Sequence, residues 1–337
     1  MKAVWFENRK ITLTAVPVPE PGENEALVKI LLAGICTTDT EIYQGYAEFS
    51  GIAGHEFVGQ VWQAPADSGL VGKRVVADIN CGCGKCDWCL CGDPRHCETR
   101  TVLGIRGKNG AFAEYIAVPV QNLHVVPDTV DTLRAVFAEP LAAAMEITQQ
   151  VHITNSMRIL VLGDGKLGLL CALGLKHFSS RVMLAGRHAE KLAIAENQGI
   201  DTLQTAEYGI RQAAFRRSGR FDMVVEATGS PTGIRETLEL VRPEGTIILK
   251  TTSHKPSEID LSAVAVNEIH LLGSRCGDID LALGFLANNR IDVLPLAEKI
   301  YPLSRFTEAF AHAAARGSLK VLIDPTQSGE SASFSVK

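Results

Sequence analysis

Three glycines directly after an apolar run constrain the fold more than any other feature of the chain. Residues 158–162 read RILVL, and Gly163, Gly165 and Gly168 follow in a G-x-G-x-x-G pattern that leads into a helix-like segment. Glycines at this spacing allow a tight turn, the approach of a pyrophosphate to the backbone, and close packing of the helix on the strand. The strand-turn-helix context therefore predicts a dinucleotide-binding unit.

Apolar runs and helix-like stretches alternate around this motif. Such alternation predicts parallel strands joined by crossover helices, which together form a doubly wound sheet covered on both faces. We assign residues 143–275 to this Rossmann domain. The expected strands are 158–162, 181–185, 221–226, 246–250 and 270–273, and the expected helices are 166–177, 190–197 and 233–241.

The first 130 or so residues have a different texture. Short runs with a period of two, such as ITLTAVPV and ALVKILLAGI, are broken by Gly and Pro. This pattern is typical of an antiparallel β domain. The full length of 337 residues suits about two domains of roughly 150 residues each, and the 46% of apolar residues suffice for two cores.

The end of the second expected strand bears on the choice of cofactor. An NAD-binding fold usually places Asp or Glu there to accept a hydrogen bond from the ribose 2′-hydroxyl. Here the position is Gly186, followed by Arg187 and His188. Without the carboxylate a 2′-phosphate is not repelled, and a guanidinium can bind that phosphate with two hydrogen bonds. The sequence therefore favours NADP; the alternative is that Arg187 is solvated at a strand end and NAD binds through other groups.

Cysteines gather between Cys81 and Cys97. Four of them follow the pattern C-x2-C-x2-C-x7-C, which is typical of a tetrahedral zinc shell, because short spacers on a glycine-rich loop let the sulfur atoms converge. A disulfide knot or a nucleic-acid zinc module are the alternatives, but we expect no secretory leader, and no basic stripe flanks the loop. The expected ligands of this zinc are Cys83, Cys86, Cys89 and Cys97.

A weaker metal signal precedes this lobe. Cys36 lies in GICTTD and His55 lies in GIAGHEFVG, and a thiolate with an imidazole suits an open zinc site completed by a carboxylate or water. One Cys and one His alone are also consistent with a buried thiol and a hydrogen-bonded histidine of the core.

Taken together, these stretches resemble the zinc-containing medium-chain dehydrogenase/reductase family of alcohol, polyol and threonine dehydrogenases. GICTTD, GHEFVG, the cysteine lobe, GAFAEYIAVP, EPLA and GDGKLG occur in the family's order, and the resemblance extends to LKVLID near the C-terminus. It implies an α/β fold in which a GroES-like, mainly-β catalytic domain (residues 1–142 and 276–337, with the zinc lobe at 81–97) accompanies the Rossmann domain.

The resemblance also implies roles for individual residues. Cys36 and His55 bind catalytic zinc, Glu56 enters or tunes that shell, and Glu139 contacts zinc directly or through water, as in the polyol and threonine branch. Thr38 takes the substrate proton. The candidate cofactor-binding residues are Gly163, Asp164, Gly165, Lys166, Leu167, Gly168, Gly186, Arg187, His188 and Thr228.

The chain departs from the family at one position. Many members carry a histidine five residues after the catalytic cysteine, which relays the proton toward solvent. Here that residue is Glu41. A carboxylate at this place either relays the proton or is a solvated glutamate on a helix surface.

The function implied is zinc-assisted hydride transfer between NAD(P) and an alcohol, a polyol or the corresponding carbonyl compound. The alternatives are a non-catalytic NADP-binding zinc protein such as a redox sensor, and a zinc-independent quinone reductase. The net charge of -5 argues against a nucleic-acid partner. Charges and prolines in residues 1–22 and the lack of a long apolar run predict no signal peptide, no membrane span and a cytoplasmic location. The resemblance suggests a homodimer or homotetramer.

Overall fold

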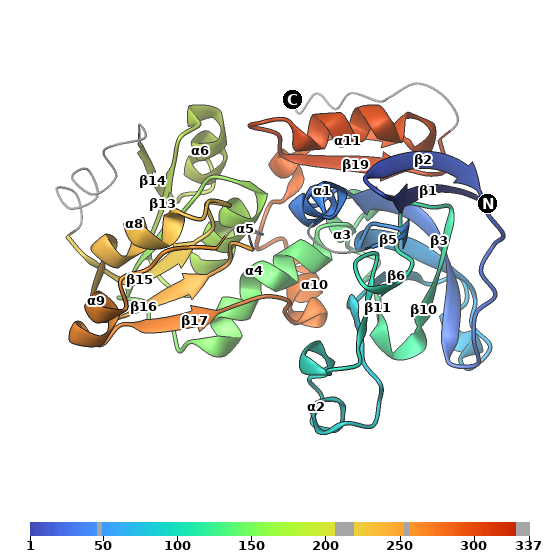
Figure 1. Ribbon diagram of the computed structural model, residues 1–337, viewed down its shortest axis with the longest axis horizontal. Coiled ribbons are helices and arrows are strands. Elements are labelled where there is room, and N and C mark those ends of the chain that lie inside the picture. The colour runs from blue at the N-terminus through green and yellow to red at the C-terminus, as the bar shows by residue number, and fades with distance from the viewer. Residues whose placement is uncertain (46–48, 206–218, 253–255, 328–337) are drawn as a thin grey trace. The chain divides into compact units, whose positions relative to one another are not determined.

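The computed structural model describes residues 1–45, 49–205, 219–252 and 256–327. The chain divides into two compact units (Figure 1), which are described separately below. Unit 1 comprises Met1–Glu139 and Ile279–Lys337, and unit 2 comprises Pro140–Asp278.

Unit 1 is mainly β-structure. Its helices are α1 (Thr37–Gln44), α2 (Asp87–Leu90), α3 (Thr132–Ala135), α10 (Ile279–Ala287) and α11 (Phe306–Ala314). Its strands are β1 (Lys2–Glu7), β2 (Lys10–Ala15), β3 (Glu25–Gly34), β4 (Gly51–Ile52), β5 (Glu56–Gln63), β6 (Arg74–Ala77), β7 (Asn80–Cys81), β8 (Thr101–Leu103), β9 (Gly107–Lys108), β10 (Tyr115–Pro119), β11 (Leu123–Val125), β18 (Ala297–Pro302) and β19 (Lys320–Asp324).

The main sheet of unit 1 brings distant parts of the chain together. Its strand order is β11-β6-β5-β3-β19-β18, with β10 also paired to β3, while β2-β1-β4 and β7-β8-β9 form smaller sheets. Both β5 and β19 run antiparallel to β3, in registers that place Gly34 opposite Glu56 and opposite Leu322. The end of β3 and the starts of β5 and β19 therefore meet at one edge. The expected antiparallel β domain is confirmed, except that β18 pairs with β19 and β8 pairs with β9 in parallel.

An aromatic cluster packs the two ends of the chain together within unit 1. Phe112 and Phe306 have ring centroids 4.8 Å apart, and Phe6 lies 6.4 Å and 6.1 Å from these two rings. All three side chains are buried. Since each large aromatic side chain removes about 150–250 Å² from water, this cluster ties α11 to the N-terminal strands.

Unit 2 is an α/β layer structure. Its strands are β12 (Arg158–Leu162), β13 (Arg181–Gly186), β14 (Asp201–Gln204), β15 (Phe221–Glu226), β16 (Val241–Leu249) and β17 (His270–Gly273). Its helices are α5 (Lys166–Leu175), α6 (Ala189–Glu196), α8 (Gly233–Leu240) and α9 (Leu261–Val266), and α4 (Ala138–Gln150) starts just before the boundary of the two units.

The sheet of unit 2 is parallel throughout, in the order β14-β13-β12-β15-β16-β17. Figure 1 shows α5, α6 and α8 lying alongside these strands. Counted from β12 as the first strand, this is the order 3-2-1-4-5-6 of a doubly wound dinucleotide-binding sheet. The predicted Rossmann architecture is thereby confirmed.

The predictions for unit 2 differ from the structure in two strands. The strand β14 was not expected, and β16 begins at Val241 rather than at residue 246. After Val241 the sequence continues with RPE, which contains a proline and Glu244 with a φ of 58°. Both features are more typical of a turn than of a strand, so the sequence pattern did not indicate a strand here. Within the described residues, no helix is both long and apolar enough to cross a bilayer.

Candidate functional site: two metal clusters and a glycine loop

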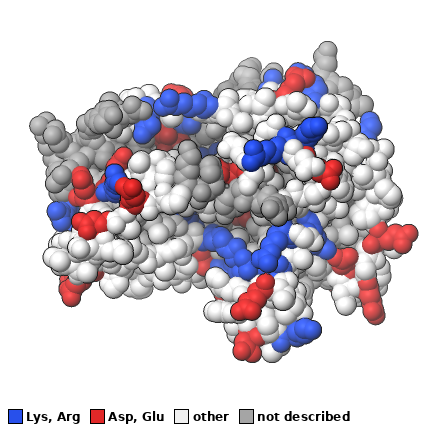
Figure 2. Space-filling model, viewed as in Figure 1, with Lys and Arg blue, Asp and Glu red and all other residues white. Residues whose placement is uncertain are grey.

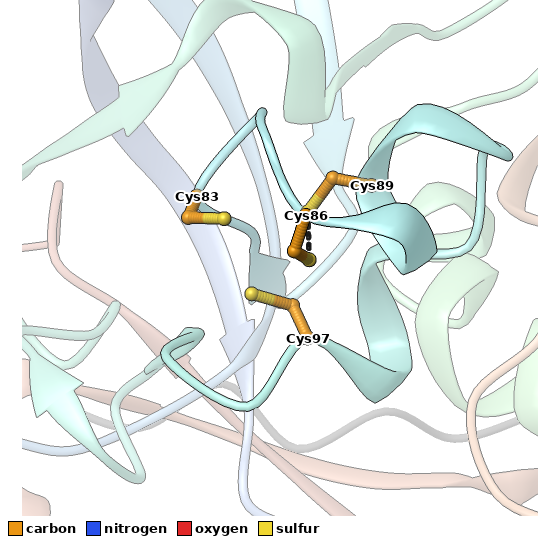
Figure 3. Close-up of side chains that lie close together, drawn as sticks. All are labelled: Cys83, Cys86, Cys89 and Cys97. Atoms are coloured by element: carbon orange, nitrogen blue, oxygen red, sulfur yellow. Dashed lines mark hydrogen bonds between the residues drawn. The ribbon is translucent and has the colours of Figure 1, made fainter.

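Four cysteines in the lobe around α2 converge on one point (Figure 3). The sulfur atoms of Cys83, Cys86, Cys89 and Cys97 all lie within 4.8 Å of one another, and those of Cys86 and Cys89 are 3.5 Å apart. Cys86 caps α2 and Cys89 lies in its single turn, so the two-residue spacer directs both sulfurs to the same side. Four thiols at these distances fit a closed tetrahedral zinc shell.

The surroundings of the lobe affect its thiols in opposite directions. Hydrogen bonds from the Cys83 backbone and then from Thr99 lower the pKa of Cys97 to about 6. A hydrogen bond from the Cys89 backbone lowers the pKa of Cys86, but desolvation and the neighbouring thiols outweigh it and raise this pKa to about 12. Figure 2 shows acidic and basic side chains interspersed on the projecting lobe rather than a field of one sign.

Two further cysteines of this stretch lie outside the cluster. Cys81 is buried, and burial raises the pKa of its thiol to about 11, so it stays protonated. Cys91 is exposed, and its sulfur donates to the carbonyl of Trp88 at 3.3 Å. Neither cysteine belongs to a group of ligand atoms found among the described residues.

The second cluster lies where β3, β5 and α1 meet. Cys36 caps α1, His55 directly precedes β5 and Glu56 is the first residue of β5, so the register of β3 with β5 brings the three together. One ligand atom from each lies within 4.8 Å of the other two. A thiolate, an imidazole and a carboxylate form a donor set that suits zinc and leaves room for a further ligand.

Asp39 lies next to two residues of this cluster, Cys36 and His55. Its Oδ2 accepts a hydrogen bond from the Cys36 backbone N–H at 2.8 Å, and its Oδ1 lies 3.5 Å from Nδ1 of His55. Asp39 is 0% and His55 4% exposed, yet Oδ1 and Nδ1 have no hydrogen-bond partner among the described residues. A carboxylate behind one ring nitrogen orients the other nitrogen toward a metal ion, so these two unpaired atoms fit a metal site.

Charge also accumulates around His55. Burial would lower the pKa of this imidazole, but the adjacent Asp39 and Cys36 outweigh burial and raise it well above its usual value. The carboxylate of Asp39 and the sulfur of Cys36 thus favour a positive charge at this place.

Glu56 forms a buried ion pair with Lys320 of β19. Glu56 is 1% and Lys320 3% exposed, and the Lys320 ammonium donates to Oε2 of Glu56. Burial would lower the pKa of Lys320, but Glu56 and then Cys36 raise it, so the lysine keeps its charge. The sequence reasoning missed Lys320 and Asp39; the available signal was a lysine inside the otherwise apolar strand KVLID.

The remaining candidates of unit 1 surround this cluster. The Thr38 hydroxyl lies 3.7 Å from the Cys36 sulfur, and Glu41 is half-buried one turn further along α1. Desolvation raises the pKa of Glu139 to about 7, with His55 lowering it and Glu56 raising it further. The Glu139 carboxylate thus interacts electrostatically with His55 and Glu56. It is not among the three residues whose ligand atoms lie within 4.8 Å of one another.

The glycine loop of unit 2 joins β12 to α5. Gly163 has a φ of 117°, and a Cβ on Gly168 would lie 1.9 Å from the Gly163 carbonyl oxygen, so both positions exclude a side chain. A Cβ on Gly165 would meet nothing within 4 Å. Open space thus lies at the N-terminus of α5, where the N–H groups of Lys166 and Leu167 begin the helix, and a pyrophosphate fits there.

The end of β13 lies beside this loop. Gly186 is its last residue, Arg187 is exposed, and His188 caps α6. The backbone N–H groups of Arg187 and His188 both donate to the Asp164 carboxylate. Arg187 also lowers the pKa of Glu236 on α8, although burial keeps that pKa raised overall.

Thr228 follows β15 at the same edge of the sheet. Its backbone N–H and its hydroxyl donate to Oε1 of Glu226 at 2.9 Å and 2.6 Å. The carboxyl ends of parallel strands are where such sheets bind ligands, so all the candidate cofactor residues lie at the expected edge.

Family models match both units. The model for the alcohol dehydrogenase GroES-like domain matches residues 22–128, and the model for the zinc-binding dehydrogenase matches residues 167–288. Among curated relatives, L-threonine 3-dehydrogenase of Saccharopolyspora erythraea is 30% identical over 332 residues, covering 94% of this chain and 96% of the relative. D-arabitol-phosphate dehydrogenase of Enterococcus avium is 28% identical over 325 residues, covering 91% and 92%.

Solved structures agree with these matches. The Escherichia coli rspB protein in complex with NADH has a TM-score of 0.90 at 28% identity, covering 96% of this chain and 99% of the other. A protein of Sinorhizobium meliloti described as a zinc-binding dehydrogenase and bound to NADP has a TM-score of 0.88 at 28% identity, with the same coverage. The chain therefore belongs to the zinc-containing medium-chain dehydrogenase/reductase family, and it is a zinc-dependent, NAD(P)-linked oxidoreductase of the alcohol dehydrogenase type.

Proposed function

We propose that the chain interconverts a polar secondary alcohol and its ketone with NADP, at the cluster formed by Cys36, His55 and Glu56. The observation that carries this proposal is the convergence of these three ligand atoms within 4.8 Å, separate from the four cysteines of the lobe. We assign residues 1–142 and 276–337 to the catalytic domain and residues 143–275 to the cofactor domain.

The residues of the cluster have distinct tasks in this proposal. Cys36, His55 and Glu56 would hold Zn²⁺, with Glu139 as a direct or water-mediated fourth group, and the lobe cysteines would hold a second, structural ion. Bound zinc would supply Lewis acidity at the substrate oxygen. Asp39, 3.5 Å from Nδ1 of His55, would orient the His55 ring when the ion is bound, and Lys320 holds the Glu56 carboxylate by a hydrogen bond.

In this proposal, two residues of α1 transfer the proton of the alcohol. The Thr38 hydroxyl lies beside the Cys36 sulfur and takes the proton from the substrate oxygen. Glu41 stands three residues further along the helix, on the same face, because residues at i and i+3 are neighbours in a helix. We propose that Glu41 passes this proton toward solvent in place of the histidine that many family members carry.

The cofactor would bind unit 2 at the carboxyl edge of the parallel sheet. NADP supplies the hydride acceptor, and the open space at Gly165 with the N-terminus of α5 receives its pyrophosphate. NADP is proposed over NAD because Gly186 offers no carboxylate at the strand end and Arg187 is exposed beside it.

Arg187→Ala tests this preference. The KM for NADP is expected to rise about tenfold or more, since charge-assisted hydrogen bonds from a guanidinium to a phosphate are lost, while the KM for NAD changes little. Steady-state kinetics with both cofactors measure the effect. An equal rise in both KM values would remove the assigned role of Arg187.

The substrate class is proposed from two supports. Glu139 stands where the polyol and threonine branch of the family has a glutamate, and relatives include L-threonine 3-dehydrogenase and D-arabitol-phosphate dehydrogenase. We therefore propose a sugar, cyclitol or amino alcohol. A panel of primary alcohols, secondary alcohols, polyols and amino alcohols, assayed with NAD and NADP, tests this; a preference for simple primary alcohols would contradict it.

The partners proposed are small molecules and further copies of the chain. A homodimer or homotetramer in the cytoplasm, with no nucleic-acid or membrane partner, is the expected state. The family membership argues against the non-catalytic sensor considered as the alternative, because the matched models and relatives are dehydrogenases. The presence of both clusters argues against a zinc-independent quinone reductase.

A further inference from the structure

Asp164 lies in the glycine loop, but its side chain forms hydrogen bonds with the residues that follow the next strand, β13. Its Oδ2 accepts hydrogen bonds from the backbone N–H groups of Arg187 and His188, both at 2.7 Å. The ring Nδ1 of His188 lies 3.0 Å from Oδ2 and 3.1 Å from Oδ1. Asp164 is only 7% exposed. The carboxylate thus fixes the two residues that follow Gly186.

The same carboxylate fills the space in front of Gly186. A Cβ built on Gly186 would lie 2.4 Å from both Cβ and Oδ2 of Asp164, well inside van der Waals contact. Gly186 does not have a positive φ, so the glycine is required here by this close approach alone. With Asp164 in place, position 186 cannot carry the strand-end acid that binds the ribose in NAD-dependent folds.

The charge of Asp164 is already compensated. Burial would raise its pKa, but the hydrogen bonds from the His188 backbone, the His188 ring and the Arg187 backbone outweigh burial and lower it. Both carboxylate oxygens are engaged, so little acceptor capacity remains for a ribose hydroxyl. Arg187 extends from the fixed backbone and is exposed.

We propose that Asp164 is a positioning residue for the 2′-phosphate of NADP. It keeps position 186 free of a side chain and holds the backbone of Arg187, so that the guanidinium reaches the phosphate. In this proposal the residue that sets the preference for NADP over NAD lies in the glycine loop, not at the end of β13. This inference rests on the cofactor preference proposed above and adds the residue that enforces it.

Binding of two nucleotide fragments tests the role of Asp164 without turnover. The full-length, zinc-loaded protein is titrated calorimetrically with 2′,5′-ADP, which carries the 2′-phosphate, and with 5′-ADP, which lacks it. Asp164→Asn keeps the shape but removes the charge that holds two backbone N–H groups. The Kd for 2′,5′-ADP is expected to rise about tenfold, since hydrogen bonds to a charged group are the stronger ones, while that for 5′-ADP changes less than about twofold.

A double variant shows whether Asp164 acts through Arg187. Residues that act as one unit are not additive, so Asp164→Asn combined with Arg187→Ala should weaken 2′,5′-ADP no further than Arg187→Ala alone. Additive losses, an equal weakening of both fragments, or an unchanged Kd for 2′,5′-ADP in Asp164→Asn would each overturn the inference. Fragment binding requires neither zinc chemistry nor an alcohol, so a failed alcohol assay leaves these outcomes readable.

An exchange of the two positions tests whether Asp164 and a side chain at position 186 compete for the same space. Gly186→Asp alone is expected to lower the melting temperature, because its Cβ meets Asp164. The pair Asp164→Gly and Gly186→Asp removes that clash and places a carboxylate at the strand end, so it is expected to bind 5′-ADP in preference to 2′,5′-ADP. A pair that still prefers 2′,5′-ADP would contradict the proposed exchange of space.

Discussion

Replacing His55 or Cys36 by Ala is expected to lower kcat/KM for the best alcohol roughly a thousandfold or more. Lewis-acid stabilisation by a bound metal is worth several kcal/mol in the transition state, and each ~1.36 kcal/mol is a factor of ten. Both side chains supply ligand atoms to the cluster at the start of β5, so either substitution opens the zinc shell. Steady-state kinetics with saturating NADP measure the loss.

The matched control for this prediction is Cys91→Ala. Cys91 is an exposed cysteine outside both ligand groups, so its loss should leave kcat/KM unchanged. Melting temperatures of the three variants separate a lost ligand from a lost fold. Full turnover in Cys36→Ala or His55→Ala would show that the chemistry takes place without this cluster.

Lys320→Met is expected to reduce the free energy of unfolding by about 3–5 kcal/mol. Removing one partner of a buried ion pair leaves the other charge uncompensated away from water. Here Glu56 would keep its buried carboxylate without the ammonium that donates to it. Urea unfolding of protein freed of zinc by a chelator measures the change, because a bound ion would itself neutralise Glu56.

Three further variants make this prediction specific. Lys320→Arg keeps the charge and should lose less, and Lys320→Met with Glu56→Gln should recover part of the loss, because both charges are gone. Lys10 on β2 is exposed, and Lys10→Met should change stability by no more than about 0.5 kcal/mol. If Lys320→Met behaves like Lys10→Met, the ion pair contributes nothing measurable to the fold.

The architecture of unit 2 was predictable because its signals are local. The strands β12, β15 and β17 have the expected bounds, since each contains a short apolar run next to glycines or polar turns. The strand β14 escaped prediction because Asp201–Gln204 is a short edge strand whose sequence, DTLQ, alternates too briefly to show a period. For β16, local turn chemistry masked a strand that pairing with β15 extends.

The candidate site was predictable only in part, for a related reason. Spacing suggested the lobe cysteines and family motifs suggested Cys36, His55 and Glu56, and these residues do converge in the structure, whereas the role of Glu139 stays a proposal. Lys320 is 264 residues away from Glu56 in the chain, so only the pairing of β19 with β3 brings the two together. Asp164 was recognised as part of the glycine loop, whereas its contact with the end of β13 depends on the tertiary structure.

Counting zinc in wild type and in Cys36→Ala tests the central claim most directly. The account assigns one ion to the closed cysteine shell of the lobe and one to the cluster of Cys36, His55 and Glu56. Mass spectrometry of native, desalted protein should therefore find about two zinc ions per wild-type chain and about one in Cys36→Ala, since a lost thiolate weakens zinc binding strongly. A single zinc ion in wild type, unchanged in Cys36→Ala, would contradict the account, because zinc would then occupy the lobe alone.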